Sequence, residues 1–195
     1  MSTGSRPRAP RRAPAERRAA IADAARAVAL SDGLGAVTLR SVAARAGVAP
    51  ALVAHYADGG MDALVAEAFA GIVGRELEEV SALVAGADDP RAALAALIHT
   101  LAGGTRDDVT AVWVEAWALG RRNETLAAAV REQMDAWHAL VRALVEPFGV
   151  ADPGTAAWQI LAMIDGTGAQ SLVRWGGTAD RSELLLRAVE GMLGL

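Results

Sequence analysis

Side chains that carry out catalysis or bind metals are few and poorly spaced in this sequence. The three histidines, His55, His99 and His138, share no short spacing typical of metal ligands, and there is no cysteine. No nucleophile elbow, phosphate-binding loop or dinucleotide-binding motif is present. The segment GGTRDD at 103–108 has the composition of a loop between helices. The sequence therefore favours a binding protein over an enzyme, and it predicts no cofactor and no metal site.

Contact with DNA is a second kind of chemistry, and it is indicated by LRSVAARAGVAPALVAHY at residues 39–56. Gly47 lies where a tight turn between two helices needs a positive φ, and Ala43 is small where the helices must approach closely. Thr38 can cap the first helix, and Pro50 suits the first turn of the second. The residues expected to share a buried face are Val42, Ala46, Val48, Val53 and Tyr56. This spacing predicts a helix-turn-helix.

Residues 17–64 resemble the DNA-binding region of the TetR family of transcriptional repressors. The resemblance implies a helix-turn-helix head and a C-terminal body for ligand binding and dimerisation. The segments WVEAWALGRRNETL and IDGTGAQSLVRW resemble the ligand-binding halves of that family only weakly. The sequence departs from the family at Ala54, Ala57 and Gly60, where two aromatics and a lysine usually contact phosphates or brace the recognition helix. The matching positions are Thr38, Ala43, Ala46, Gly47, Val48, His55, Tyr56 and Leu64.

The predicted recognition helix carries few hydrogen-bonding groups. Its first residues, 49–52, can offer only apolar contacts to thymine methyl groups. We therefore expect affinity to depend on phosphate contacts and on N-terminal arginines that enter a narrow minor groove. The alternatives are that Arg40 and Arg45 are ordinary surface arginines and that the N-terminal arginines belong to a solvated tail. The predicted DNA-binding residues are Thr38, Arg40, Arg45, Ala49, Pro50, Ala51, Leu52, His55 and Tyr56; the predicted arm residues are Arg8, Arg11 and Arg12, with Arg6, Arg17 and Arg18 beside them.

Charge is distributed unevenly along the chain. The net charge is −4, all 19 basic residues are arginine, and 53% of the residues are hydrophobic. Residues 1–60 carry 9 arginines and 4 acidic residues, whereas residues 61–195 carry 10 arginines and 19 acidic residues. A basic head on an acidic body is typical of a protein that binds a polyanion at one end. A disordered basic tail on an unrelated helical protein is the alternative.

Apolar periodicity predicts an all-α chain of about nine helices. Residues 1–14 read as a flexible Arg/Pro-rich arm, 15–60 as the helix-turn-helix domain, and 61–195 as a ligand-binding and dimerisation domain. No apolar run is long enough to span a membrane, and no signal peptide is expected, so the sequence favours a cytoplasmic protein. The predicted helices are about 15–31, 38–46, 50–57, 61–84, 90–102, 107–121, 124–147, 154–175 and 180–193.

Tryptophans in the middle of the body indicate a ligand pocket. Trp113 and Trp117 are four residues apart and share a helix face. An apolar pocket with a few polar groups is typical of small-molecule sites between helices, although core packing is the alternative for each residue. Further polar candidates are Glu115, Asp165 and Gln170. The predicted ligand-binding residues are Trp113, Trp117, Trp137, His138, Trp158, Gln159 and Met163.

Small and apolar residues near the C-terminus indicate a dimer. Glycine inside a helix needs a packing reason, and a small-residue stripe lets helices approach closely. The predicted interface residues are Ala162, Gly166, Ala169, Leu184, Leu185, Ala188 and Met192.

The sequence thus predicts a homodimeric, ligand-responsive transcriptional regulator that acts as a repressor. It is expected to bind a palindromic double-stranded DNA operator and to be released from it by a small apolar or aromatic effector. The alternative functions are a helical protein-binding adaptor, a ligand-binding protein without specific DNA recognition, and, least favoured, an enzyme.

Overall fold

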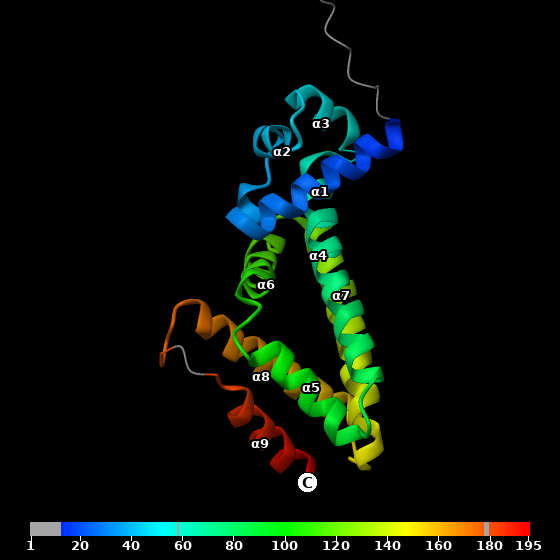
Figure 1. Ribbon diagram of the computed structural model, residues 1–195, viewed down its shortest axis with the longest axis vertical. Helices are drawn as coiled ribbons and strands as arrows, with labels where there is room; N and C mark the ends of the chain where they lie inside the picture. Colours follow the sequence, from blue (N-terminus) through cyan, green and yellow to red (C-terminus); the bar gives the residue numbers. More distant parts are fainter. Residues whose placement is uncertain (1–12, 58, 178–179) are drawn as a thin grey trace, which may run out of the picture.

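The computed structural model describes residues 13–57, 59–177 and 180–195. Over these ranges it contains nine α-helices, two short 3-10 helices and no strand, which confirms the predicted all-α fold (Figure 1). The elements are α1 Pro14–Asp32, η1 Leu34–Ala36, α2 Leu39–Ala46, α3 Pro50–Tyr56, α4 Gly60–Ala85, α5 Pro90–Ala102, α6 Asp107–Gly120, α7 Glu124–Val145, η2 Glu146–Phe148, α8 Pro153–Leu172 and α9 Ser182–Leu193.

Most helix ends lie within two residues of the prediction, because turn and cap residues mark them in the sequence. Asp89, Asn123 and Asp152 each cap a helix by accepting a hydrogen bond from a backbone N–H in its first turn. The end of α8 was predicted wrongly: it stops at Leu172, not at 175. Arg174 has a φ of 55°, which α-helical backbone does not allow, so the chain turns away there.

Helices α1, α2 and α3 form a head at one end of the molecule, and α4 leads from the head into the body (Figure 1). Helix α1 packs against α2 and against the first part of α4. Its buried face is made of Ile21, Ala24, Ala25, Val28 and Ala29. Because α4 belongs to the cores of both head and body, a displacement of the N-terminal part of α4 also moves the head.

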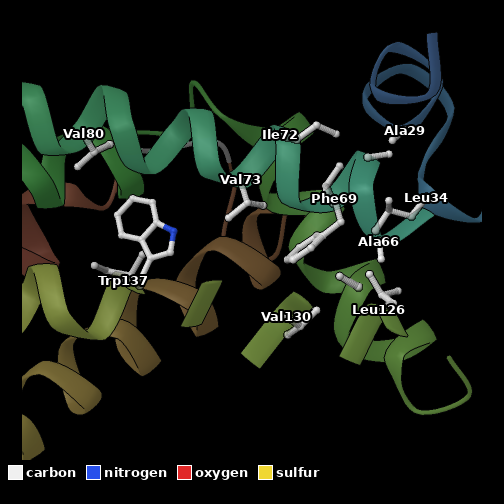
Figure 2. Close-up of a cluster of buried hydrophobic side chains, with 14 of the residues drawn as sticks. Ala29, Leu34, Ala66, Phe69, Ile72, Val73, Val80, Leu126, Val130 and Trp137 are labelled. Atoms are coloured by element: carbon white, nitrogen blue, oxygen red, sulfur yellow. The ribbon is translucent and has the colours of Figure 1, made fainter. Parts of the chain in front are cut away.

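The body is built around α4 and α7, which run side by side. Figure 2 shows Phe69 and Val73 of α4 facing Leu126 and Val130 of α7, with Trp137 of α7 next to Val80. Helix α7 also packs against α6 and α8, while α9 packs mainly against α5. Among the described residues, no helix is both long and apolar enough to cross a membrane.

Candidate functional site

The two short helices of the head are joined by a sharp turn. Thr38 Oγ1 accepts a hydrogen bond from Ser41 N (3.1 Å), and Ser41 Oγ accepts one from Thr38 N (2.9 Å), which fixes the start of α2. Gly47 ends α2 with a φ of 67°, in the left-handed region that disfavours other residues. Pro50 then opens α3. The helix-turn-helix predicted from the sequence therefore has the expected caps and turn.

Burial within the head separates packing residues from surface residues. Val42, Ala43 and Val53 are buried where α2, α3 and α1 meet. Ala46, Val48 and Tyr56 are half-buried and pack against the same core. Leu52 and Tyr56, both predicted DNA contacts, are half-buried, so only part of each is available; the predicted contacts that are exposed are Thr38, Arg40, Arg45, Ala49, Pro50, Ala51 and His55.

The exposed surface of α3 is poor in hydrogen-bonding groups. His55, whose ring packs edge-on to Tyr56 at 5.1 Å between centroids, is the polar side chain of this surface. Arg40 and Arg45 are exposed on α2, the first helix of the helix-turn-helix. The predicted arm residues Arg8, Arg11 and Arg12, with Arg6, lie outside the described residues. The exposed surface of this helix-turn-helix therefore combines arginines on α2 with a largely apolar α3.

A cavity of about 570 Å³ lies between α6, α7 and α8, with one side closed by α4 and α5. This volume falls within the range that holds drug-sized molecules. Helix α8 lines it with residues three or four apart, which places them on one face. The lining includes the predicted Trp113, Trp117, Trp137, His138 and Trp158, and also Leu101, Met134, Leu161, Ala162 and Ile164.

The tryptophans at the cavity differ in their surroundings. Trp113 packs edge-on to Phe69 at 5.1 Å and lies 5.8 Å from Trp117, so neighbouring aromatic rings hold its indole. Trp137 is 5% exposed and also belongs to the core between α4 and α7 (Figure 2). Trp158 is 66% exposed, which places it at the rim. The cavity therefore has aromatic walls and an aromatic edge.

Charged groups gather at the end of the cavity near α4. Glu76 is 5% exposed, and its Oε1 lies 2.8 Å from Arg106 Nε, while its Oε2 accepts a hydrogen bond from Trp113 Nε1 (3.5 Å). Burial raises the pKa of Glu76, although Arg106 opposes the shift. Burial also raises the pKa of Asp165, from 3.8 to about 6, and the neighbouring Glu76 carboxylate adds to the increase.

Glu76 and Arg106 line the cavity but were not among the residues predicted from the sequence. Glu76 had a visible signal, because it falls in register with the buried Phe69, Ile72, Val73 and Val80 of α4. A glutamate on an apolar helix face needs a partner or a ligand. Arg106 lies in the loop before α6 and gave no such signal.

Some predicted ligand residues lie away from the cavity. Gln159 is exposed and Met163 lies in a separate groove between α8 and α9, because they face other sides of α8 from Trp158 and Leu161. Gln170 lines the same groove. His138 does reach the cavity, and its Nε2–H donates to Gly154 O (2.9 Å).

Glu115 lies on the far side of α6 from the tryptophans and reaches the head. Its Oε2 accepts a hydrogen bond from Gly35 N (3.2 Å). Gly33, with a φ of 91°, has no Cβ to collide with this carboxylate, so the close approach depends on glycine. Helix α6 thus contacts the cavity through Trp113 and the head through Glu115.

The predicted interface residues of α8 and α9 lie on an open surface, with one exception. Gly166 has nothing within 4 Å of the position that a Cβ would occupy, and Leu184 is 60% exposed. Leu185 is 5% exposed and packs within its own chain, so it can contribute little to a contact with a second copy. The remaining residues, Ala162, Ala169, Ala188 and Met192, are exposed or half-buried.

Two family models match the chain. Residues 21–68 match the bacterial regulatory proteins of the tetR family, and residues 90–194 match the C-terminal region of BetI-type transcriptional repressors. The second match alone spans more than half of the chain. The chain therefore belongs to the TetR family of transcriptional regulators, as the helix-turn-helix resemblance predicted. The family consists of DNA-binding transcription factors and not of enzymes.

Solved structures show the same fold. A TetR-family regulator from Rhodococcus sp. superimposes with a TM-score of 0.77 at 21% identity, covering 92% of this chain and 99% of the other. A transcriptional regulator from Rhodococcus sp. Rha1 gives 0.74 at 26% identity, covering 91% and 94%. The fatty acid degradation regulator FadR from Bacillus halodurans gives 0.69 at 20% identity, covering 90% and 96%. Among curated proteins, no sequence matches the chain.

Proposed function

We propose that this regulator is a homodimeric repressor that binds a palindromic operator in the cytoplasm and releases it when a small, largely apolar or aromatic molecule occupies the cavity. The observation that carries this proposal is the position of α6. Trp113 and Trp117 of this helix line the cavity, and Glu115, between them in sequence, accepts a hydrogen bond from the backbone of the head. A ligand that displaces α6 therefore acts on the head directly.

Dimerisation through α8 and α9 is supported by the open groove between these helices. Ala162, Gly166 and Ala188 line it with little side-chain volume, and Leu184 adds exposed apolar surface. Two copies packed on this surface would bury small residues against each other, as closely packed helices require. A two-fold dimer recognises an inverted repeat, with half-sites about one helical turn, roughly 34–36 Å, or somewhat more apart.

The first experiment selects bound DNA from a random pool with the full-length protein. We expect an inverted repeat among the selected sequences. Arg45→Ala should weaken binding to the selected site and reduce the slope of log affinity against log salt by about 0.9 if the side chain neutralises one phosphate. Selected sequences without any inverted repeat contradict the dimeric operator.

The second experiment tests the response to ligand. Apolar and aromatic compounds are screened by tryptophan fluorescence, and those that bind are added to the operator complex. Allosteric coupling of about 1–3 kcal/mol corresponds to a roughly 5- to 150-fold loss of operator affinity. Gly166→Leu, which fills the groove between α8 and α9, should give a monomer that binds the operator poorly. A Gly166→Leu protein that is still dimeric by light scattering would locate the interface elsewhere.

A further inference from the structure

The exposed side of α3 near its start consists of hydrocarbon. Figure 1 shows α3 at the outer end of the head, away from the body. Val53 is buried and Leu52 is half-buried on the inner side of this helix. Pro50, Ala51 and Ala54 are exposed, and their spacing of three and four residues brings them to one side of it. None of these three side chains has a hydrogen-bond donor or acceptor.

Polar groups around the start of α3 are already used within the head. Pro50 has no N–H, and the N–H of Leu52 donates to Ala49 O (2.9 Å). At the start of α2, Thr38 Oγ1 accepts a hydrogen bond from Ser41 N (3.1 Å), and Ser41 Oγ accepts one from Thr38 N (2.9 Å). The start of α3 therefore has few groups left that can bond to a base edge.

The other polar side chains belong to different parts of the helix-turn-helix. His55 is near the C-terminal end of α3, where its ring packs against Tyr56. A recognition helix contacts base edges mainly through its N-terminal residues, while the helix before it crosses the sugar-phosphate backbone. Arg40 and Arg45 are on that preceding helix, α2. Base discrimination under the start of α3 is therefore left to apolar contacts.

Apolar contacts distinguish pyrimidines by a single group. In the major groove, thymine presents the O4 acceptor and a C5-methyl group, whereas cytosine presents an N4 amino donor and no methyl group. A side chain without donor or acceptor does not sense the exchange of O4 for N4 and senses only the methyl group. Because 5-methylcytosine carries this group at the same position, it offers such a side chain the same contact as thymine.

We infer that α3 reads the operator through the C5-methyl groups of pyrimidines, so that 5-methylcytosine replaces thymine and cytosine methylation changes operator affinity. Since this specifies how the operator is recognised, it rests on the proposed function. The methyl groups of Ala51 and Ala54 make the contacts. The arginines of α2 contribute affinity that does not depend on base methylation.

Operators in which one group is exchanged at a time test this inference with the full-length protein. Each thymine of the selected site is replaced in both half-sites by uracil, which lacks only the methyl group, and then by cytosine and by 5-methylcytosine. One buried methyl group contributes about fourfold in affinity, so one contact in each half-site contributes about fifteenfold. Anisotropy of labelled operator measures the affinities.

We expect uracil to weaken binding about fifteenfold at one or more thymine positions, and 5-methylcytosine to bind about fifteenfold more tightly than cytosine at the same positions. Uracil operators that bind as well as the thymine operator at every position overturn the inference. The same holds if 5-methylcytosine binds no better than cytosine where uracil weakens binding.

Variants of α3 separate a contact with the methyl group from an effect of that group on DNA shape. Ala51→Gly and Ala54→Gly remove the contacting groups, so the ratio of thymine to uracil affinity should fall to about one in at least one of these variants. Ala19→Gly removes the same group from an exposed position of α1, with a similar loss of helix propensity, and should leave the ratio unchanged. A ratio that is retained in both α3 variants assigns the effect to DNA shape and overturns the inference.

Failure of methyl readout is distinguishable from failure of the proposed function. If the selected sites contain an inverted repeat that ligand releases, but affinity does not depend on methyl groups, the repressor is correct and the methyl readout is wrong. If binding depends on methyl groups but the sites lack an inverted repeat, or no ligand releases them, the methyl readout is correct and the ligand-controlled dimeric repressor is wrong.

Discussion

Asp165→Asn should stabilise the ligand-free protein at neutral and alkaline pH. An ionised carboxylate in a half-buried, unpaired position is costly, and the raised pKa of Asp165 measures that cost. The shift from 3.8 to about 6 is about two units. At about 1.36 kcal/mol per unit, the cost is at most about 3 kcal/mol, and water in the cavity reduces it to about 1–2 kcal/mol.

The dependence on pH has a definite sign. Because the pKa of Asp165 is higher in the folded state than the ordinary 3.8, the folded protein binds more protons between pH 4 and about 6 than the unfolded chain. The contribution of Asp165 to the free energy of unfolding therefore falls as pH rises through this window. Asparagine does not titrate. The free energy of unfolding of the variant should therefore equal that of the wild type below about pH 4, exceed it increasingly up to about pH 6, and exceed it by a constant amount above that pH.

Urea unfolding followed by tryptophan fluorescence measures this difference at several pH values. The protein concentration is held constant, because the proposed dimerisation would make the apparent stability depend on it. Asp135→Asn is the control, since this carboxylate is exposed at the rim of the same cavity and its removal should change stability little. A variant at position 165 that is less stable than the wild type at pH 8, or whose advantage does not change with pH, refutes the argument.

Three further perturbations follow from the contacts described above. Arg106→Ala leaves the buried carboxylate of Glu76 without its guanidinium and should lower the free energy of unfolding by about 3 kcal/mol, a loss that Glu76→Gln in the same protein should partly restore. Glu115→Ala removes the hydrogen bond between α6 and the head, so the ligand-induced change in operator affinity should become about fivefold smaller while ligand affinity is unchanged. Anisotropy of labelled operator measures this change, and an effect of ligand as large as in the wild type would exclude Glu115 as the connection between the cavity and the head. Gly47→Ala forces a side chain into the left-handed turn and should cost about 1–2 kcal/mol in urea unfolding, whereas Gly35→Ala, which has open space and no positive φ, should be nearly neutral.

Local sequence determined most of the fold. The cap at Thr38, the glycine at 47 and the proline at 50 specify α2, the turn and α3 through contacts within a few residues. For the same reason most helix ends of the body matched their predictions. The exception is α8, which ends at Leu172, shortly before the positive φ of Arg174. Arginine is not a typical turn residue, so the sequence does not indicate a helix end there.

Only the tertiary structure decided which side chains meet in the cavity. The position of Trp113 and Trp117 on one face was predictable, because residues four apart in a helix lie on the same side of it. Glu115, equally close in sequence, reaches the head instead. Gln159 and Met163 face away from the cavity although their helix lines it.

The polar end of the cavity depended still more on long-range packing. Glu76, Arg106 and Asp165 come from α4, from the loop before α6 and from α8, and they are between 30 and 89 positions apart in the sequence. Helical periodicity specifies which residues share a face of one helix. The rotation and depth at which that helix packs against its neighbours depend on the volume of every side chain between them, so the contacts across the cavity exist only once the whole body has folded.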